Sequence, residues 1–233
     1  MSTITKLFRA MEANGSLACV GLDPDPKKMP KSIKSSNESV RVGNFLSEVI
    51  SITAQSVCCY KAQKAFFDGL TGGHELLKET IEIVHDQYPL LPVFVDCKIG
   101  DIDNTMDAYL DNLFGKLDAD GIVVNPYMGD EVIHAISKYP DRAGIVLVKT
   151  SNPGGAIVQD ALMQDGRPVW EYILDLVVNR WNTACNLIPV ISSTAGLDLG
   201  LNIKNVHLIT QNMLNKFISQ LSGHTSVNIN ILF

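Results

Sequence analysis

The sequence predicts a single α/β domain built as a (β/α)8 TIM barrel. Short apolar, β-rich runs alternate with longer amphipathic segments along the 233 residues, and this alternation is typical of repeated β-α units around a parallel sheet. Several of the short runs are almost continuously apolar, as strands buried on both faces must be. A chain of this length accommodates one such barrel, so residues 1–233 are predicted to form one domain.

The expected elements can be assigned in chain order. Eight strands are expected at residues 17–22, 57–60, 93–97, 121–124, 143–149, 187–192, 206–209 and 227–232. Helices are expected at residues 3–14, 38–55, 75–86, 103–117, 131–139 and 169–182. An open doubly wound sheet is the second choice, and the absence of a Gly-rich dinucleotide motif after the first strand weakens it.

The last third of the sequence has less room for helices. Only residues 195–205 separate the sixth and seventh expected strands, which is short for a barrel helix, and the chain ends at Phe233 with the eighth strand. The final helix of a barrel and some loops are therefore expected to be missing, because the sequence is either truncated or interrupted.

Composition excludes several classes of function. The formal net charge of −6 disfavours a nucleic-acid-binding surface but leaves room for a small anionic substrate held by a few cations. The five cysteines are odd in number and lack zinc-ligand spacing, which indicates reduced, mostly buried thiols. No signal peptide and no membrane-length apolar stretch is present, so we expect a soluble, cytoplasmic protein without a membrane partner.

Charged residues gather where the second and third expected strands end. Asp96 and Lys98 should share one face of the third strand, because side chains alternate along a strand. Lys61 follows the neighbouring strand, and Asp101 lies three residues beyond Lys98. In a barrel, the chemistry takes place at the carboxyl ends of the strands. We therefore predict a catalytic centre of alternating charges, although a structural ion-pair network is an alternative.

Several motifs then resemble one enzyme family. Residues 96–105, DCKIGDIDNT, match the pattern D-x-K-x-x-D-I-x-x-T. Further matching segments are CVGLDPDP at 19–26, YKAQKAFF at 60–67, VNPYMG at 124–129 and VLVKTSNP at 146–153. In this order, the segments resemble orotidine 5′-phosphate decarboxylases of the branch found in many bacteria and some protozoa. The resemblance covers about residues 15–160 closely.

The resemblance implies an activity and a set of roles. Members decarboxylate the nucleotide orotidine 5′-monophosphate to uridine 5′-monophosphate in pyrimidine synthesis, without metal or other cofactor. They are homodimeric barrels with shared active sites. By resemblance, Lys98 is the proton donor and Asp96 faces the substrate carboxylate, while Lys61 and Asp23 hold the ribose hydroxyls and complete the charge network.

The resemblance also implies further substrate-binding residues. Asp101, Ile102 and Thr105 match a trio that is donated across the dimer to the partner's site. Ser151 matches a position whose hydroxyl contacts the base, and Gln63 stands where relatives often have Asn.

The phosphate-binding elements of the family are not evident. Relatives carry a Pro-Gly-x-Gly-Ala-Gln loop after the seventh strand and an Arg after the eighth. Here the corresponding run is LITQN at 208–212, in which Gln211 is the candidate remnant of that loop. Hidden loop residues, a shortened chain and a relative that lost phosphate binding all remain open, and an intact mass well above 25.5 kDa would favour the first.

Two other functions stay open beside the decarboxylase. Sugar-phosphate decarboxylases and aldolases of the same superfamily share D-x-K-x-x-D, but they usually carry Glu where Lys61 stands and use magnesium. A non-catalytic homologue is the other alternative, and the missing phosphate elements are its only support.

Overall fold

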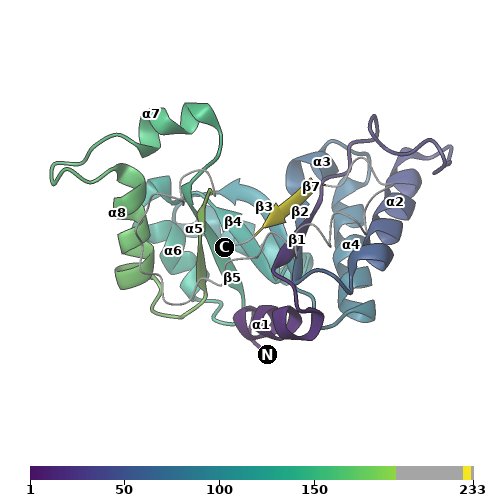
Figure 1. Cartoon of the computed structure of the whole chain (residues 1–233), viewed down its shortest axis with the longest axis horizontal. Coiled ribbons are helices and arrows are strands. Elements are labelled where there is room, and N and C mark those ends of the chain that lie inside the picture. Colours follow the sequence, from purple (N-terminus) through teal and green to yellow (C-terminus); the bar gives the residue numbers. More distant parts are fainter. Residues whose placement is uncertain (193–227, 232–233) are drawn as a thin grey trace.

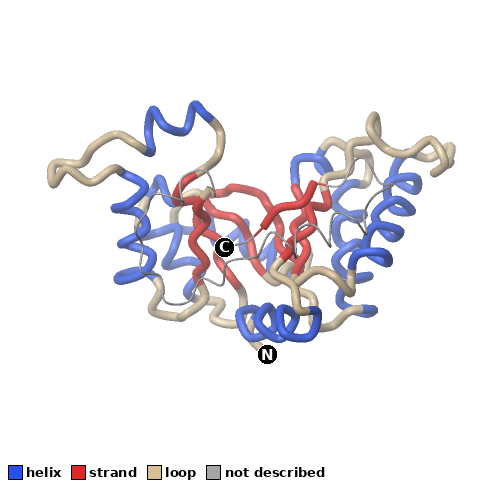
Figure 2. The backbone as a smooth tube through the Cα atoms, viewed as in Figure 1, coloured by secondary structure: helices blue, strands red, loops and turns tan. Residues whose placement is uncertain are grey.

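Six parallel strands form a curved central sheet. The computed structural model describes residues 1–192 and 228–231. The strands lie in the order β6-β5-β4-β3-β2-β1, and all neighbouring pairs among them are parallel. Their bounds are Ala18–Leu22 (β1), Cys59–Gln63 (β2), Val93–Ile99 (β3), Gly121–Val124 (β4), Ala143–Lys149 (β5) and Leu187–Ile191 (β6). Figure 2 shows the sheet curling between its helices.

Helices cover the outer face of this sheet (Figure 1). On one side lie α2 (Glu38–Thr53), α3 (Lys64–Asp68) and α4 (Gly73–Gln87), and on the other α5 (Asp103–Leu110), α6 (Asp130–Ser137) and α8 (Val169–Leu176). The last turns of two helices widen into π-helix, η1 (Asp111–Lys116) and η4 (Val177–Trp181). Two 3-10 turns, η2 (Pro126–Met128) and η3 (Pro153–Gly155), and the short α7 (Ala156–Gln159) complete the connections.

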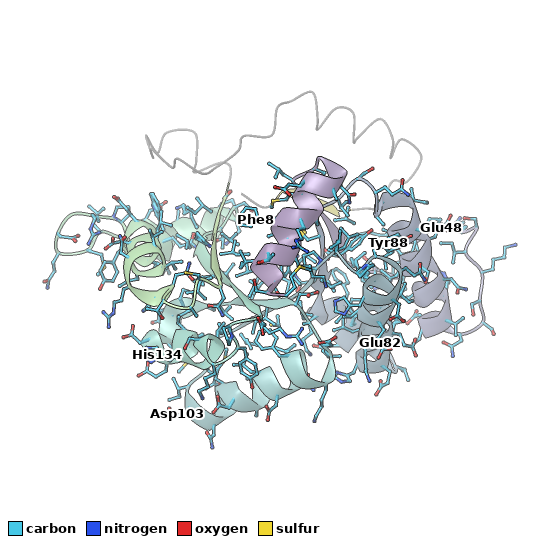
Figure 3. All side chains as sticks on the ribbon, turned by 90° about the horizontal axis from the view of Figure 1, so that it is seen from below. Phe8, Glu48, Glu82, Tyr88, Asp103 and His134 are labelled. Atoms are coloured by element: carbon cyan, nitrogen blue, oxygen red, sulfur yellow. The ribbon has the colours of Figure 1, made fainter. Side chains whose placement is uncertain are left out.

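Helix α1 (Thr3–Asn14) lies across the end of the sheet where the strands begin (Figure 3). Ser2 caps it by accepting a hydrogen bond from the Thr5 amide, and Gly15 ends it in the left-handed conformation that glycine adopts without strain. The helix buries Leu7 and Ala10 against the core. The sequence predicted this helix with the same bounds.

The core lies between the sheet and its helices. Every residue of β1 and β4 is buried, as the nearly continuous apolar runs predicted. Tyr60, Phe67 and Phe94 are among the largest fully buried side chains. Cys19, Cys58 and Cys59 are also buried, as expected from their place in apolar runs.

The eight-stranded parallel arrangement is only partly present in the described residues. The expected strand at 227–232 is found as β7 (Asn228–Ile231), but it pairs antiparallel with β1. The expectation of a parallel strand was therefore wrong, because an apolar run predicts a strand but not its direction. The antiparallel strand covers the edge of β1, whose backbone groups would otherwise lack partners. The strand expected at 206–209 lies outside the described residues.

Some boundaries also differ from expectation. β2 begins and ends later than predicted, so that Lys61 and Gln63 lie within the strand and not after it. The helices expected at 103–117 and 169–182 each change to π-helix in their last turns. Among the described residues, no helix combines the length and apolar character needed to cross a membrane.

Candidate active site

Strands β2 and β3 bring the predicted charges to the inner face of the sheet. In their parallel register, Gln63 lies opposite Asp96. The Tyr60 hydroxyl bonds Thr53 of α2 at 2.8 Å, so Tyr60 faces the helices. Because side chains alternate along a strand, Lys61 and Gln63 point the other way, and both reach Asp96.

Lys61, Asp96 and Lys98 form a continuous ion-pair cluster, called here the charged triad. Lys61 Nζ lies 2.9 Å from Asp96 Oδ2, and Lys98 Nζ lies 2.7 Å from Asp96 Oδ1. Gln63 Nε2 adds a longer hydrogen bond of 3.4 Å to Oδ2. The Asp96 side chain is 8% exposed and that of Lys61 14%, whereas Lys98 is 48% exposed. The triad therefore has a buried anion and one accessible cation.

The two lysines keep Asp96 ionised. Burial on its own would raise the Asp96 pKa, but the charge of Lys61 and the hydrogen bond from Lys98 outweigh it, so the pKa is lowered. A buried carboxylate flanked by two ammonium groups leaves the triad with a net positive charge. It can therefore attract an anionic ligand and stabilise negative charge that develops near Lys98.

Lys98 reaches the triad through an irregular stretch of β3. Its backbone has φ +46°, and the register between β3 and β4 shifts between Val95 and Ile99. A bulge of this kind redirects side chains and often accompanies active sites. The left-handed conformation of a non-glycine residue costs on the order of 1 kcal/mol. The prediction of a shared face with Asp96 assumed regular alternation, and it did not anticipate this bulge.

Gly100 allows the end of β3 to approach β4 closely. A Cβ atom at Gly100 would lie 2.2 Å from the backbone oxygen of Asn125, which no side chain can tolerate. The Asn125 amide donates to the Ile99 carbonyl at 2.7 Å and closes this contact. The glycine of the motif therefore serves the packing that follows Lys98.

A cleft of about 580 Å³ borders the triad. It is bounded by the β2–α3 junction, the end of β3 and one face of α5 and η1. Of the triad, Asp96 lines it together with Gln63, whereas neither Lys61 nor Lys98 does; Cys97 lines it as well. Sequence reasoning missed the helical wall beyond Thr105. That wall consists of Ala108, Tyr109, Asn112 and Leu113, and their spacing of three, four, seven and eight residues from Thr105 marks one helix face.

The residues after β3 do not join the triad. Asp101 is partly buried, and its carboxylate accepts the Ile102 amide at 2.9 Å. Ile102 and Thr105 are exposed at the start of α5. Within the described residues, Asp101 forms no ion pair with Lys61 or Lys98, so the expected alternating set of four charges is a set of three in one chain.

The other predicted ligand residues lie at the same end of the sheet. Asp23 is partly buried directly after β1. Ser151 is exposed shortly after β5, before η3. Gln211 lies outside the described residues.

Cys97 points away from the triad, as its position between Asp96 and Lys98 predicted. Its thiol donates to the Val123 carbonyl of β4 at 3.5 Å. Burial raises the Cys97 pKa to about 11, so the thiol stays protonated at neutral pH and is a poor nucleophile. The Cys97 side chain therefore contributes to the packing between β3 and β4.

Known proteins are similar to this chain in sequence and in fold. The model of the orotidine 5′-phosphate decarboxylase / HUMPS family matches residues 16–181. Orotidine 5′-phosphate decarboxylase from Cupriavidus necator is 38% identical over 194 residues, which cover 83% of this chain and 70% of the relative. The relative of the same name from Cellvibrio japonicus is also 38% identical, with the same coverage.

Solved structures agree with the sequence relatives. The structure of Leishmania donovani OMP decarboxylase matches with a TM-score of 0.72 and 32% identity, over 82% of this chain and 70% of that chain. An orotidine 5′-phosphate decarboxylase structure from Streptomyces avermitilis, described as putative, matches with a TM-score of 0.69 and 26% identity, over 85% and 73% of the two chains. This chain belongs to the orotidine 5′-phosphate decarboxylase / HUMPS family.

Proposed function

We propose that this protein decarboxylates orotidine 5′-monophosphate to uridine 5′-monophosphate, a step of pyrimidine synthesis. The observation that carries the proposal is the charged triad, in which a buried carboxylate lies between two ammonium groups. The names of the relatives support the same reaction. A closed (β/α)8 barrel formed by residues 1–233 as one domain is part of the proposal, and the curved sheet of six parallel strands supports it.

Lys98 is the proton donor in this mechanism. The bond between the ring carbon and the carboxylate breaks, CO2 leaves, and the electron pair stays on the ring carbon. The Lys98 ammonium stabilises that developing negative charge and then transfers a proton to the carbon. Its 48% exposed side chain supports this role, because a ligand can reach it.

Asp96 positions both lysines and faces the substrate carboxylate. Each of its oxygens accepts from a different lysine, and this holds Lys98 in place before the substrate binds. Its lowered pKa keeps it charged, so repulsion from the substrate carboxylate would be relieved as CO2 departs.

Other residues are proposed to bind the rest of the nucleotide. Lys61 and Asp23 hold the ribose hydroxyls, Gln63 assists beside Asp96, and Ser151 contacts the base. Their positions at the ends of β1, β2 and β5 support this assignment, because ligands of barrel enzymes bind at the carboxyl ends of strands. Gln211 is retained as a phosphate contact.

The active form is proposed to be a homodimer in which Asp101, Ile102 and Thr105 complete the partner's site. Two facts support this arrangement. Asp101 forms no ion pair with the lysines of its own triad in the described residues. Apolar side chains are also exposed after β3 and after β4, where Ile102 is 39% and Tyr127 85% exposed, and exposed apolar surface is typical of association sites when it is contiguous.

The activity can be tested by following CO2 release from orotidine 5′-monophosphate in excess EDTA. The wild-type protein should be active, and Lys98→Ala should lower kcat by at least about 10³-fold, because it removes both the acid and the stabilising charge. Lys78→Ala, which breaks a surface pair with Glu82 on α4, is the matched control and should retain activity. A wild-type protein that releases no CO2, or a fully active Lys98→Ala variant, would refute the proposal.

A further inference from the structure

A second pocket gathers positive charge away from the candidate active site. It lies in the segment between β1 and α2, which projects beside α2 at the opposite end of the molecule from α7 (Figure 1). Its volume is about 470 Å³, and its lining residues are Lys31, Ile33, Lys34, Ser35, Ser36 and Arg41. None of these residues lines the cleft beside the charged triad.

Most cations of this segment lack carboxylate partners; the exception is Lys28, which pairs with Asp25. Of the 17 Lys and Arg residues among those the structure describes, 11 form an ion pair with Asp or Glu. The remaining six are Arg9, Lys27, Lys31, Lys34, Arg41 and Lys116. Four of these six fall within residues 27–41, so unpaired positive charge is concentrated in this one segment.

The segment is anchored, so that its cations are presented at defined positions. Met29 is buried, and Ile33 packs against the hydrophobic core. Arg41 donates to the Pro26 carbonyl at 3.0 Å, which ties the start of α2 to the segment. The anchored backbone therefore keeps the Cα atoms of these largely exposed cations near one another, and an external anion would reduce the repulsion between their charges.

The chemistry of the pocket suits a phosphate. The Ser35 hydroxyl oxygen accepts the Asn37 amide at 3.1 Å, so its own proton remains available to an acceptor. Arg41 offers a planar fork of donors, and Lys31 and Lys34 offer point charges. The whole chain has a formal net charge of −6, which disfavours binding of an extended polyanion. A short anion that stays within a Debye length of the pocket is affected mainly by the local cations.

We infer that this pocket binds a small, multiply charged phosphate ligand of the diphosphate class. The site is separate from the proposed decarboxylation centre, and its occupancy does not require that activity.

Titration calorimetry with inorganic pyrophosphate on the full chain tests the inference. The double variant Lys31→Gln/Lys34→Gln should bind pyrophosphate at least about tenfold more weakly than the wild type. The control Arg9→Gln/Lys116→Gln removes the same charge from two exposed residues that also lack ion pairs, and it should bind within about twofold of the wild type. Circular dichroism of both variants checks that they fold.

A second titration in the presence of saturating uridine 5′-monophosphate distinguishes the two sites, because the nucleotide should fill the proposed active site. Pyrophosphate binding should persist in its presence, and Lys31→Gln/Lys34→Gln should decarboxylate at the wild-type rate. Equal weakening of both double variants would mean general electrostatic attraction and would overturn the inference. An absence of binding to the wild type, or its loss with the nucleotide, would also overturn it.

Discussion

Two buried aspartates, one at each end of the sheet, are both held by basic side chains, and we propose that only one of them has a catalytic role. At the carboxyl end, Asp96 joins the charged triad. At the amino end, Asp120 contacts Lys6 at 2.8 Å and His85 at 2.7 Å. Both aspartate side chains are 8% exposed. Burial alone would raise the Asp120 pKa, as for Asp96, but the contacts with His85 and Lys6 outweigh it and lower the pKa.

The two clusters differ in how far their lysine side chains are exposed to solvent. Asp120 also accepts the Val93 amide at 2.8 Å, and Lys6 of α1 is only 11% exposed. Helix α1 covers this end of the sheet (Figure 3). In the triad, by contrast, Lys98 is 48% exposed on a left-handed backbone. A cluster that is buried beneath a helix stabilises the fold, whereas one with an accessible cation can act on a ligand.

The largest expected effect separates the two aspartates. Asp96→Asn should lower kcat at least about 100-fold, because it loosens the group that positions Lys98. Asp120→Asn should lower the free energy of unfolding by about 3 kcal/mol, because it leaves Lys6 buried without its anion, and it should keep its activity per folded molecule. Urea unfolding and steady-state kinetics on both variants measure this.

Asp118→Asn serves as the control for the amino-end cluster. Asp118 contacts His85 and Arg142 but is 56% exposed, so its loss should change stability by less than about 1 kcal/mol. If Asp96→Asn and Asp120→Asn instead lost stability and activity in the same proportion, the division into a functional and a structural cluster would be wrong.

A smaller effect is expected at Gly100. Gly100→Ala would place a Cβ atom against the Asn125 carbonyl, and we expect a loss of about 2 kcal/mol in unfolding free energy together with reduced kcat, because Lys98 would shift. In Gly115→Ala, the added Cβ meets nothing within 4 Å. Because alanine favours helix over glycine, the free energy of unfolding of this variant should stay the same or rise slightly. If both variants had similar unfolding free energies and kcat values, the packing role assigned to Gly100 would be wrong.

The smallest effect concerns pH. Because the folded state lowers the Asp120 pKa, its contribution is fully present above the ordinary value of about 3.9 and is lost as the pH falls through the lowered folded pKa. The wild type should therefore lose more stability than Asp120→Asn as the pH falls from about 5 to 3. If the free energy of unfolding fell equally with pH for the wild type and for Asp120→Asn, the stabilising role assigned to the Asp120 carboxylate would be wrong.

Much of the fold and part of the site could be predicted from the sequence. The helix at 3–14 and the strands at 121–124 and 143–149 have the predicted bounds, because their hydrophobic periodicity is local and strong. The motif at 96–105 led to the family that the comparisons establish. The pairing of Lys61 with Asp96 also followed from the expectation that strands two and three are neighbours.

The remainder depends on contacts between distant residues. Lys6 and Asp120 are 114 residues apart, and neither lies in a motif that suggests the other. The direction of β7 and the positive φ of Lys98 likewise cannot be deduced from alternation, since a neighbouring chain segment imposes them. The gathering of unpaired cations around one pocket becomes visible only when the partners of all other described cations are known.

The sequence by itself therefore determined the alternation of strands and helices, the family, and the charged residues proposed for the site, because each of these depends on local periodicity or on residues close together in the chain. For the charges other than Lys61 and Asp96, only the tertiary structure decided which of them meet. It joined Lys98 to Asp96 through a bulge and left Asp101 outside the triad. The physical reason is that ion pairs and backbone strain depend on distances of a few ångströms between segments, and packing alone sets those distances.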